Sequence, residues 1–254
     1  MKLHTLLYDF VDIIGAFPTM EAIKLVPTAN GLHFYGKSCV SSKVGMFVLE
    51  GQAVEPVDGV KSRFGIPHFG QVAKIFKAPG FTRMNASVEL DKFTSVSEFE
   101  QLVFSSQDGS TYKLSVYGSD LSDQRIKLVK VKAQVSYQVS TTPTKDALSV
   151  TKYWLKVSRE NGASAVELTP ITRGGELLFK TTAAPIFDVE YVVDRSVGGV
   201  LTQLMRYDCR LLFSLMSLAP ETKQSTLMFS DSGLCRFDVE TSCAKYTFLI
   251  PANQ

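Results

Sequence analysis

The chain has 254 residues, of which 45% are hydrophobic and 20% charged, and its formal net charge is +2. This balance allows a packed core and excludes an intrinsically disordered chain. The near-neutral total also excludes a uniformly basic nucleic-acid binder, so any contact with nucleic acid has to come from uneven placement of charge. No stretch approaches the roughly 20 apolar residues that span a bilayer, so we expect no membrane helix.

Composition gives no sign of catalytic or metal chemistry. The cysteines are Cys39, Cys209, Cys235 and Cys243. They form no CxxC pair and no histidine cluster lies near them, which predicts reduced, buried thiols in an intracellular protein. The glycine pairs at 174–175 and 198–199 lack the context of a phosphate-binding loop. We therefore expect a protein that is not an enzyme and that holds no metal and no cofactor.

Apolar periodicity predicts four helices, over about residues 3–15, 67–77, 143–158 and 206–218. Pro67 suits the first turn of the second helix. Thr142 and Pro143 suit the cap and first position of the third.

Between the helices, alternating and β-branched segments bounded by turn signals predict strands. In the first half these are Ala22–Pro27, Leu32–Tyr35, Gly45–Leu49, Ala86–Leu90, Phe99–Phe104 and Thr111–Val116. In the second half they are Ala165–Leu168, Glu176–Lys180, Phe187–Val193, Thr226–Phe229, Leu234–Val239 and Tyr246–Ile250.

The order of these elements repeats. The two helices of each half start about 64 residues apart, and three strands follow the second helix of each pair. A shift of roughly 140 residues superposes the halves. The repeat predicts two domains of like topology, residues 1–118 and 131–254, with residues 119–130 as the connector between them.

Cations recur on one side of three of the helices. On the third helix they follow steps of three and four residues, which places them on one face. Cationic faces without aromatic side chains suit contact with phosphates and no reading of base sequence. Tyr153 and Trp154 on the same helix are interpreted as core and border packing. The predicted DNA-binding residues are Lys74, Lys77, Arg83, Lys145, Lys152, Lys156, Arg159, Arg206 and Arg210.

The first helix differs, because its polar side carries Asp9 and Asp12 and only Lys2 and His4 offset them. If this helix faced DNA, we would expect it to repel phosphates or to contact them through water. The three helices just described are expected to carry no acid on their cationic faces.

The C-terminal run from Thr226 to Ala252 resembles the last strands of the DNA sliding clamps, which end in an aromatic-rich strand and a tail that contains proline. The run Cys39–Val44 resembles a loop beside the partner pocket of the eukaryotic clamp, proliferating cell nuclear antigen. The helix and strand order extends the resemblance over nearly the whole chain. The resemblance implies an α+β fold of two clamp domains, with antiparallel sheets outside and two helices inside each.

In that family, two domains per chain imply a homotrimeric ring that encircles double-stranded DNA without sequence specificity. The subunits would join by pairing the strand Thr111–Val116 of one copy with Phe187–Val193 of the next. DNA polymerase and the clamp loader would dock short hydrophobic peptides into an outer groove. The matching partner-binding positions are Val40, Val44, Ile126, Leu128, Leu249, Ile250 and Pro251. These residues could instead simply close the core under the connector.

The low identity to cellular clamps favours a phage protein, which would act in the host cytoplasm, whereas a eukaryotic clamp would act in the nucleus. Two alternatives stay open at this point. One is a virion structural or assembly protein, which needs no clustered cations. The other is a monomeric processivity factor that holds DNA by charge and does not encircle it.

Overall fold

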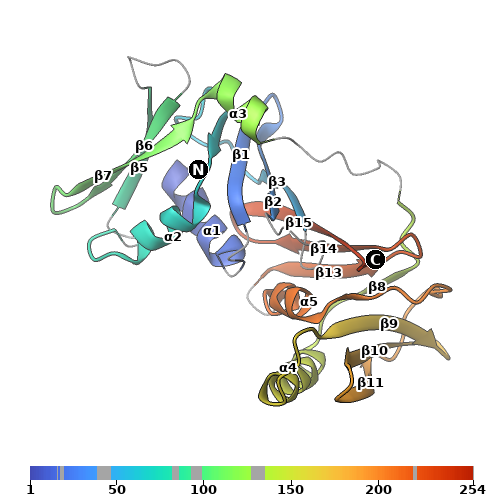
Figure 1. The fold of residues 1–254 in the computed structure, drawn as a ribbon. Helices are drawn as coiled ribbons and strands as arrows, with labels where there is room; N and C mark the ends of the chain where they lie inside the picture. Colours follow the sequence, from blue (N-terminus) through green and yellow to red (C-terminus); the bar gives the residue numbers. More distant parts are fainter. Residues whose placement is uncertain are drawn as a thin grey trace. The chain divides into compact units, whose positions relative to one another are not determined.

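The computed structural model describes residues 1–15, 17, 20–38, 47–81, 86–92, 99–126, 135–219 and 222–253 (Figure 1). The chain forms two compact units. Unit 1 contains Met1–Cys39, Val48–Val129 and Thr241–Tyr246. Unit 2 contains Val40–Phe47, Lys130–Glu240 and Thr247–Gln254. Within the described ranges, no helix combines the length and the apolar character needed to cross a membrane.

Unit 1 is an antiparallel sheet with two helices packed on one face. Its strands are β1 (Met20–Thr28), β2 (Gly31–Ser38), β3 (Val48–Ala53), β4 (Phe64–Ile66), β5 (Ala86–Lys92), β6 (Phe99–Ser106) and β7 (Thr111–Tyr117). They lie in the order β5-β6-β7-β4-β1-β2-β3. Its helices are α1 (Leu3–Ile14), α2 (Phe69–Lys77) and α3 (Ser119–Arg125).

Aromatic rings hold α1 and α2 together and onto the sheet. The rings of Tyr8 and Phe76 stack with centroids 3.9 Å apart, which joins the two helices. Phe10 meets Phe34 of β2 at 4.6 Å in an edge-on arrangement. Phe10 and Phe34 are fully buried. Burial of such rings contributes on the order of 1.5–3 kcal/mol each, so packing, more than intrinsic helix propensity, stabilises these helices.

Unit 2 contains two antiparallel sheets and a second pair of helices. One sheet has the order β11-β10-β9-β12 and the other contains β15-β14-β13-β8. The strands are β8 (Val139–Thr141), β9 (Glu167–Arg173), β10 (Glu176–Ala183), β11 (Phe187–Asp194), β12 (Tyr207–Asp208), β13 (Gln224–Phe229), β14 (Leu234–Glu240) and β15 (Ala244–Pro251). The residues of β15 up to Tyr246 are counted in unit 1. The helices are α4 (Lys145–Glu160) and α5 (Cys209–Met216).

A polar contact inside unit 2 fixes α4 on its sheet. The hydroxyl groups of Thr151 on α4 and Tyr191 on β11 lie 2.8 Å apart, and that of Thr181 on β10 lies 3.2 Å from Tyr191. Thr151 and Thr181 are fully buried. Burial raises the pKa of Tyr191 to about 12, so its hydroxyl stays protonated and can donate one of these bonds.

The predicted α+β class, with antiparallel sheets and a few helices, is confirmed, and so are the four predicted helices. Two starts differ. The cap of α4 is Thr144, whose hydroxyl accepts from the Ala147 amide, so Thr142 and Pro143 precede the helix. The cap of α5 is Asp208, which accepts from the Leu211 amide, so this helix begins at Cys209 and leaves out Arg206. In both cases the side chain that reaches an unpaired amide decides the start.

The prediction missed one helix and three short strands. Helix α3 lies in the segment 119–130, which was predicted as the connector and for which no helix was predicted. Strands β4, β8 and β12 have only two or three residues each. Segments this short carry too few residues for a periodic pattern.

The expected acidic face of α1 is wrong for Asp9. This carboxylate is only 8% exposed and accepts hydrogen bonds from the hydroxyls of Thr241, at 2.8 Å, and of Tyr246. Asp9 therefore joins α1 to the C-terminal segment within unit 1 and is not available to repel phosphates. Asp12 is exposed, as expected.

We expect Tyr246→Phe to lower the free energy of unfolding by about 1.5–3 kcal/mol, because a hydrogen bond to a buried charged group is lost. Urea denaturation measures the change. Tyr153→Phe is the matched control, since that side chain is 59% exposed and its loss of a hydroxyl should leave stability unchanged. Equal stability of the two variants would show that Asp9 does not depend on Tyr246.

Candidate nucleic-acid interface and subunit edges

Helix α4 presents a cationic face to solvent. Ala147, Thr151 and Ser158 lie on its buried side. The predicted DNA-binding residues of this helix, Lys145, Lys152, Lys156 and Arg159, are all exposed. A helix that buries one stripe must expose the opposite one, so the three- and four-residue spacing of the cations gathers them on one surface.

This face is not free of acids, which corrects the expectation from the sequence. Asp146 and Glu160 are also exposed on α4. Lys156 Nζ lies 3.7 Å from Glu160 Oε1, one helical turn away, and both side chains are more than half exposed. An exposed pair of this kind contributes only about 0.3–0.5 kcal/mol, so a phosphate can compete with Glu160 for the lysine.

Helix α2 carries the second group of cations. Lys74 and Lys77 are exposed, while Phe69, Val72 and Phe76 are buried. Both lysines lie in the last turn, where the helix dipole favours positive charge. Arg83 lies outside the described residues.

The two predicted arginines near α5 have different surroundings. Arg210 is exposed on the helix, and its guanidinium lies 3.5 Å from the carbonyl oxygen of Ala163. Arg206 lies before β12 and pairs with Glu167, Nη1 to Oε2, at 3.3 Å. Its carbonyl accepts from the Asn253 amide at 2.6 Å. Arg206 is thus tied to Glu167 and the C-terminal tail and does not continue the helical face.

The structure therefore separates available cations from paired ones. Within the described part of the chain, six of the predicted residues form no ion pair, and each is exposed. They are Lys74, Lys77, Lys145, Lys152, Arg159 and Arg210. In unit 1 they lie on α2, and in unit 2 on α4 and α5.

Two strands have an edge that is mostly unpaired. Strand β7 pairs with β6 along its whole length, but among the described residues its other side meets β4 only at Tyr117. Strand β11 lies at the end of its sheet and, within the described ranges, pairs only with β10. The unused backbone N–H and C=O groups of such edges can pair with another strand.

Apolar side chains lie exposed along both edges, and sequence reasoning missed them. Tyr112 on β7 is 45% exposed and Val192 on β11 is 40% exposed. Trp154 on α4, half-buried, packs on Phe187 at the start of β11 with ring centroids 5.1 Å apart. Tyr153 was expected in the core or its border and is mostly exposed. Only the pairing of the strands reveals that Tyr112 and Val192 lie on strands with an open edge.

Of the predicted partner-binding residues, the structure describes four, and three of these are buried. Ile126 in unit 1 is 5% exposed, and in unit 2 Leu249 and Ile250 are 6% and 1% exposed. Pro251 is half-buried. Val40, Val44 and Leu128 lie outside the described residues. A role of this set in partner binding stays a prediction.

The buried thiols have low reactivity. Burial raises the pKa of Cys209 to about 12, and it raises the pKa of Cys235 well above its ordinary value. Both thiols therefore stay protonated at neutral pH and are poor nucleophiles. Among the described residues, no cluster of three side chains suited to bind a metal is present.

No family model matches the chain, and no curated protein matches it. Solved structures do. PCNA of Thermococcus kodakaraensis superposes with a TM-score of 0.68 at 11% identity, over 97% of each chain. PCNA of A. fulgidus, solved with the C-terminal region of FEN-1, has a TM-score of 0.65 at 12% identity, over 99% of this chain and 96% of that one.

The PCNA2–PCNA3 complex of Sulfolobus tokodaii gives a TM-score of 0.65 at 12% identity, over 98% of this chain and 96% of the matched one. These matches cover nearly the entire chain, so both halves take part in the likeness. The resemblance seen in the sequence is confirmed at the level of the fold. The chain has the fold of the DNA sliding clamps.

Proposed function

We propose that the protein is a DNA polymerase processivity factor: a ring of three copies that encircles duplex DNA and catalyses no reaction. Each copy would supply two clamp domains, residues 1–118 and 131–254, joined by the connector 119–130. The observation that carries this proposal is the clamp fold combined with exposed, unpaired cations on the helices of both units.

Lysines and arginines on rigid helices suit a protein that slides. Their contact with phosphates is long-ranged and independent of sequence, and salt weakens it. A ring is held by its topology, so it needs no tight bond, and each specific contact would become a barrier to movement. Four of the unpaired cations, Lys74, Lys77, Lys145 and Lys152, are lysines, whose mobile ammonium groups can pass from one phosphate to the next.

Ring closure would use the two open edges. Pairing β7 of one copy with β11 of the next is a head-to-tail contact, which closes into a ring when the rotation allows it. It would cover Tyr112 on one side and the rings of Trp154 and Phe187 on the other. Lys113 is exposed on β7, and Asp188 and Glu190 are exposed on β11, where they already pair with Lys180 and Arg173 of the same sheet.

Partners would bind through short hydrophobic peptides. The PCNA of A. fulgidus has been solved with the C-terminal region of FEN-1 bound, which supports this mode of partner binding for the fold. We propose that the polymerase and a clamp loader use the predicted partner-binding residues given above. The protein would act in the cytoplasm of the host if a phage encodes it.

We expect the double variant Lys152→Glu with Lys156→Glu to abolish processive synthesis on a primed circular template, since the face would repel phosphates. Lys61→Glu with Lys223→Glu is the control, because both side chains are exposed, lie outside the helices and change the net charge equally. Primer-extension product length reports the effect. Full product length with the first variant would reject α4 as a DNA-facing helix.

Replacing one cation at a time by alanine should distinguish the cations that form no ion pair from those that do. For Lys152→Ala, the slope of log affinity against log salt on duplex DNA should become shallower by about 0.9, the value for one lost phosphate contact. Arg206→Ala should change the slope less, because Glu167 already neutralises that guanidinium. Fluorescence anisotropy between low and moderate salt measures both. Equal changes would show that the Arg206 pair opens on DNA.

The ring itself is tested by mass and by DNA topology. Light scattering should give three times the 28.0 kDa of one chain, and the protein should stay on circular but not on linear DNA. Tyr112→Ala and Trp154→Ala should each shift the mass towards one chain, whereas Tyr153→Phe should not. A wild-type monomer that binds short linear DNA would instead support the open, charge-held processivity factor.

A further inference from the structure

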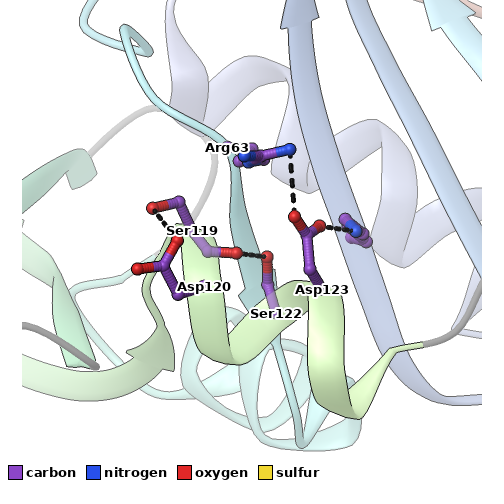
Figure 2. A network of polar contacts seen from close by, with 6 residues as sticks. Arg63, Ser119, Asp120, Ser122 and Asp123 are labelled. Carbon is purple, nitrogen blue, oxygen red and sulfur yellow. Dashed lines mark hydrogen bonds and ion pairs between the residues drawn. The ribbon is translucent and has the colours of Figure 1, made fainter.

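Helix α3 is anchored on unit 1 by a bridge of charges (Figure 2). The Asp123 carboxylate of α3 pairs through one oxygen with Lys24 of β1. Its other oxygen lies 2.9 Å from Arg63 Nη1, in the segment that leads into β4. One carboxylate thus ties the start of the predicted connector to β1 and to the segment just before β4.

The bridge is needed because of where Lys24 lies. Its side chain is only 7% exposed, and within the described residues Asp123 is its single ionic partner. A buried ammonium without a counter-ion is strongly disfavoured. The sheet therefore holds a charge that is satisfied only while α3 is docked. Arg63 and Asp123 are 49% and 37% exposed, so this part of the bridge is open to competing ions.

Apolar contacts define where α3 sits. Leu121 and Ile126 are buried, and Ser122 is fully buried. A Cβ placed on Gly65 of β4 would lie 2.7 Å from Ile126 Cδ1 and 3.1 Å from Ser122 Cβ. Gly65 therefore leaves the space that the helix occupies. The helix itself has only seven residues and no side-chain cap at its start, so its own hydrogen bonds hold it weakly.

We propose that Asp123, Lys24 and Arg63 form a charge-controlled latch that holds α3 on unit 1 and thereby positions Ile126. The functional meaning of the latch rests on the proposed function, in which Ile126 belongs to the partner-binding groove. The three charged residues act through the helix and need not touch a partner. Loss of the charge on Asp123, or competition by salt, releases the start of the connector.

Hydrogen exchange of the full chain, free of DNA and partners, tests the latch without assuming clamp activity. In Asp123→Asn the amides of residues 119–126 should exchange at least about tenfold faster than in the wild type. Asp120→Asn is the matched control, since it removes one exposed charge from the same helix. Asp123→Glu should restore most of the protection. Exchange in α3 of the wild type should rise with NaCl, and that of Asp123→Asn should not.

Two further variants keep the test decisive if Asp123→Asn unfolds unit 1. In Lys24→Met with Asp123→Asn the buried charge is gone as well, so β6 should stay protected while α3 exchanges fast. Gly65→Ala should loosen α3 by steric contact alone, with its salt dependence kept. Protection of α3 in the double variant equal to that in the wild type would overturn the proposal, and so would equal effects of Asp123→Asn and Asp120→Asn.

Discussion

The surface of this protein follows from the burial of one side of each long helix. Phe10 of α1 and Phe76 of α2 fill the core of unit 1, and Ala147 and Thr151 anchor α4 in unit 2. Once those side chains are fixed, residues three and four positions apart on the other side have to face water. The packing of the core thereby gathers Lys145, Lys152 and Arg159 on one face, although they are not adjacent in the sequence.

The burial of a charged residue decides its role in this protein. Asp9 and Asp12 are three residues apart on α1, yet Asp9 is buried as an acceptor for Thr241 and Tyr246 and Asp12 meets solvent. Lys24 and Lys74 differ in the same way, since the first is buried against Asp123 and the second is exposed. Charge counted along the sequence therefore overstates the acidity of α1.

The edges of β7 and β11 can still form backbone hydrogen bonds with another strand. Among the residues that the structure describes, backbone groups along β7 and β11 lack partners over most of one side, and exposed apolar side chains lie beside them. In a protein that stays alone in solution, long open edges favour aggregation, so they need protection. Closure of a ring would provide it through the same type of hydrogen bond that builds each sheet. The latch proposed for α3 would meet a different need, which is to keep the predicted connector in one place while the strand edges and helices stay available.

The sequence by itself determined the α+β class, the four longer helices and the exposed cations of α2 and α4, because hydrophobic periodicity reports burial directly. It also located the two edge strands as strands. Tertiary structure decided what periodicity cannot encode. Thr144 and Asp208 set helix starts through side-chain bonds to amides, and Glu167 neutralised Arg206 from a distant strand. The short α3 was held by Leu121, Ile126 and Asp123, whose partners lie far away in the chain. Such contacts form between segments that are far apart in the chain, and a single sequence does not reveal which of these segments pack together.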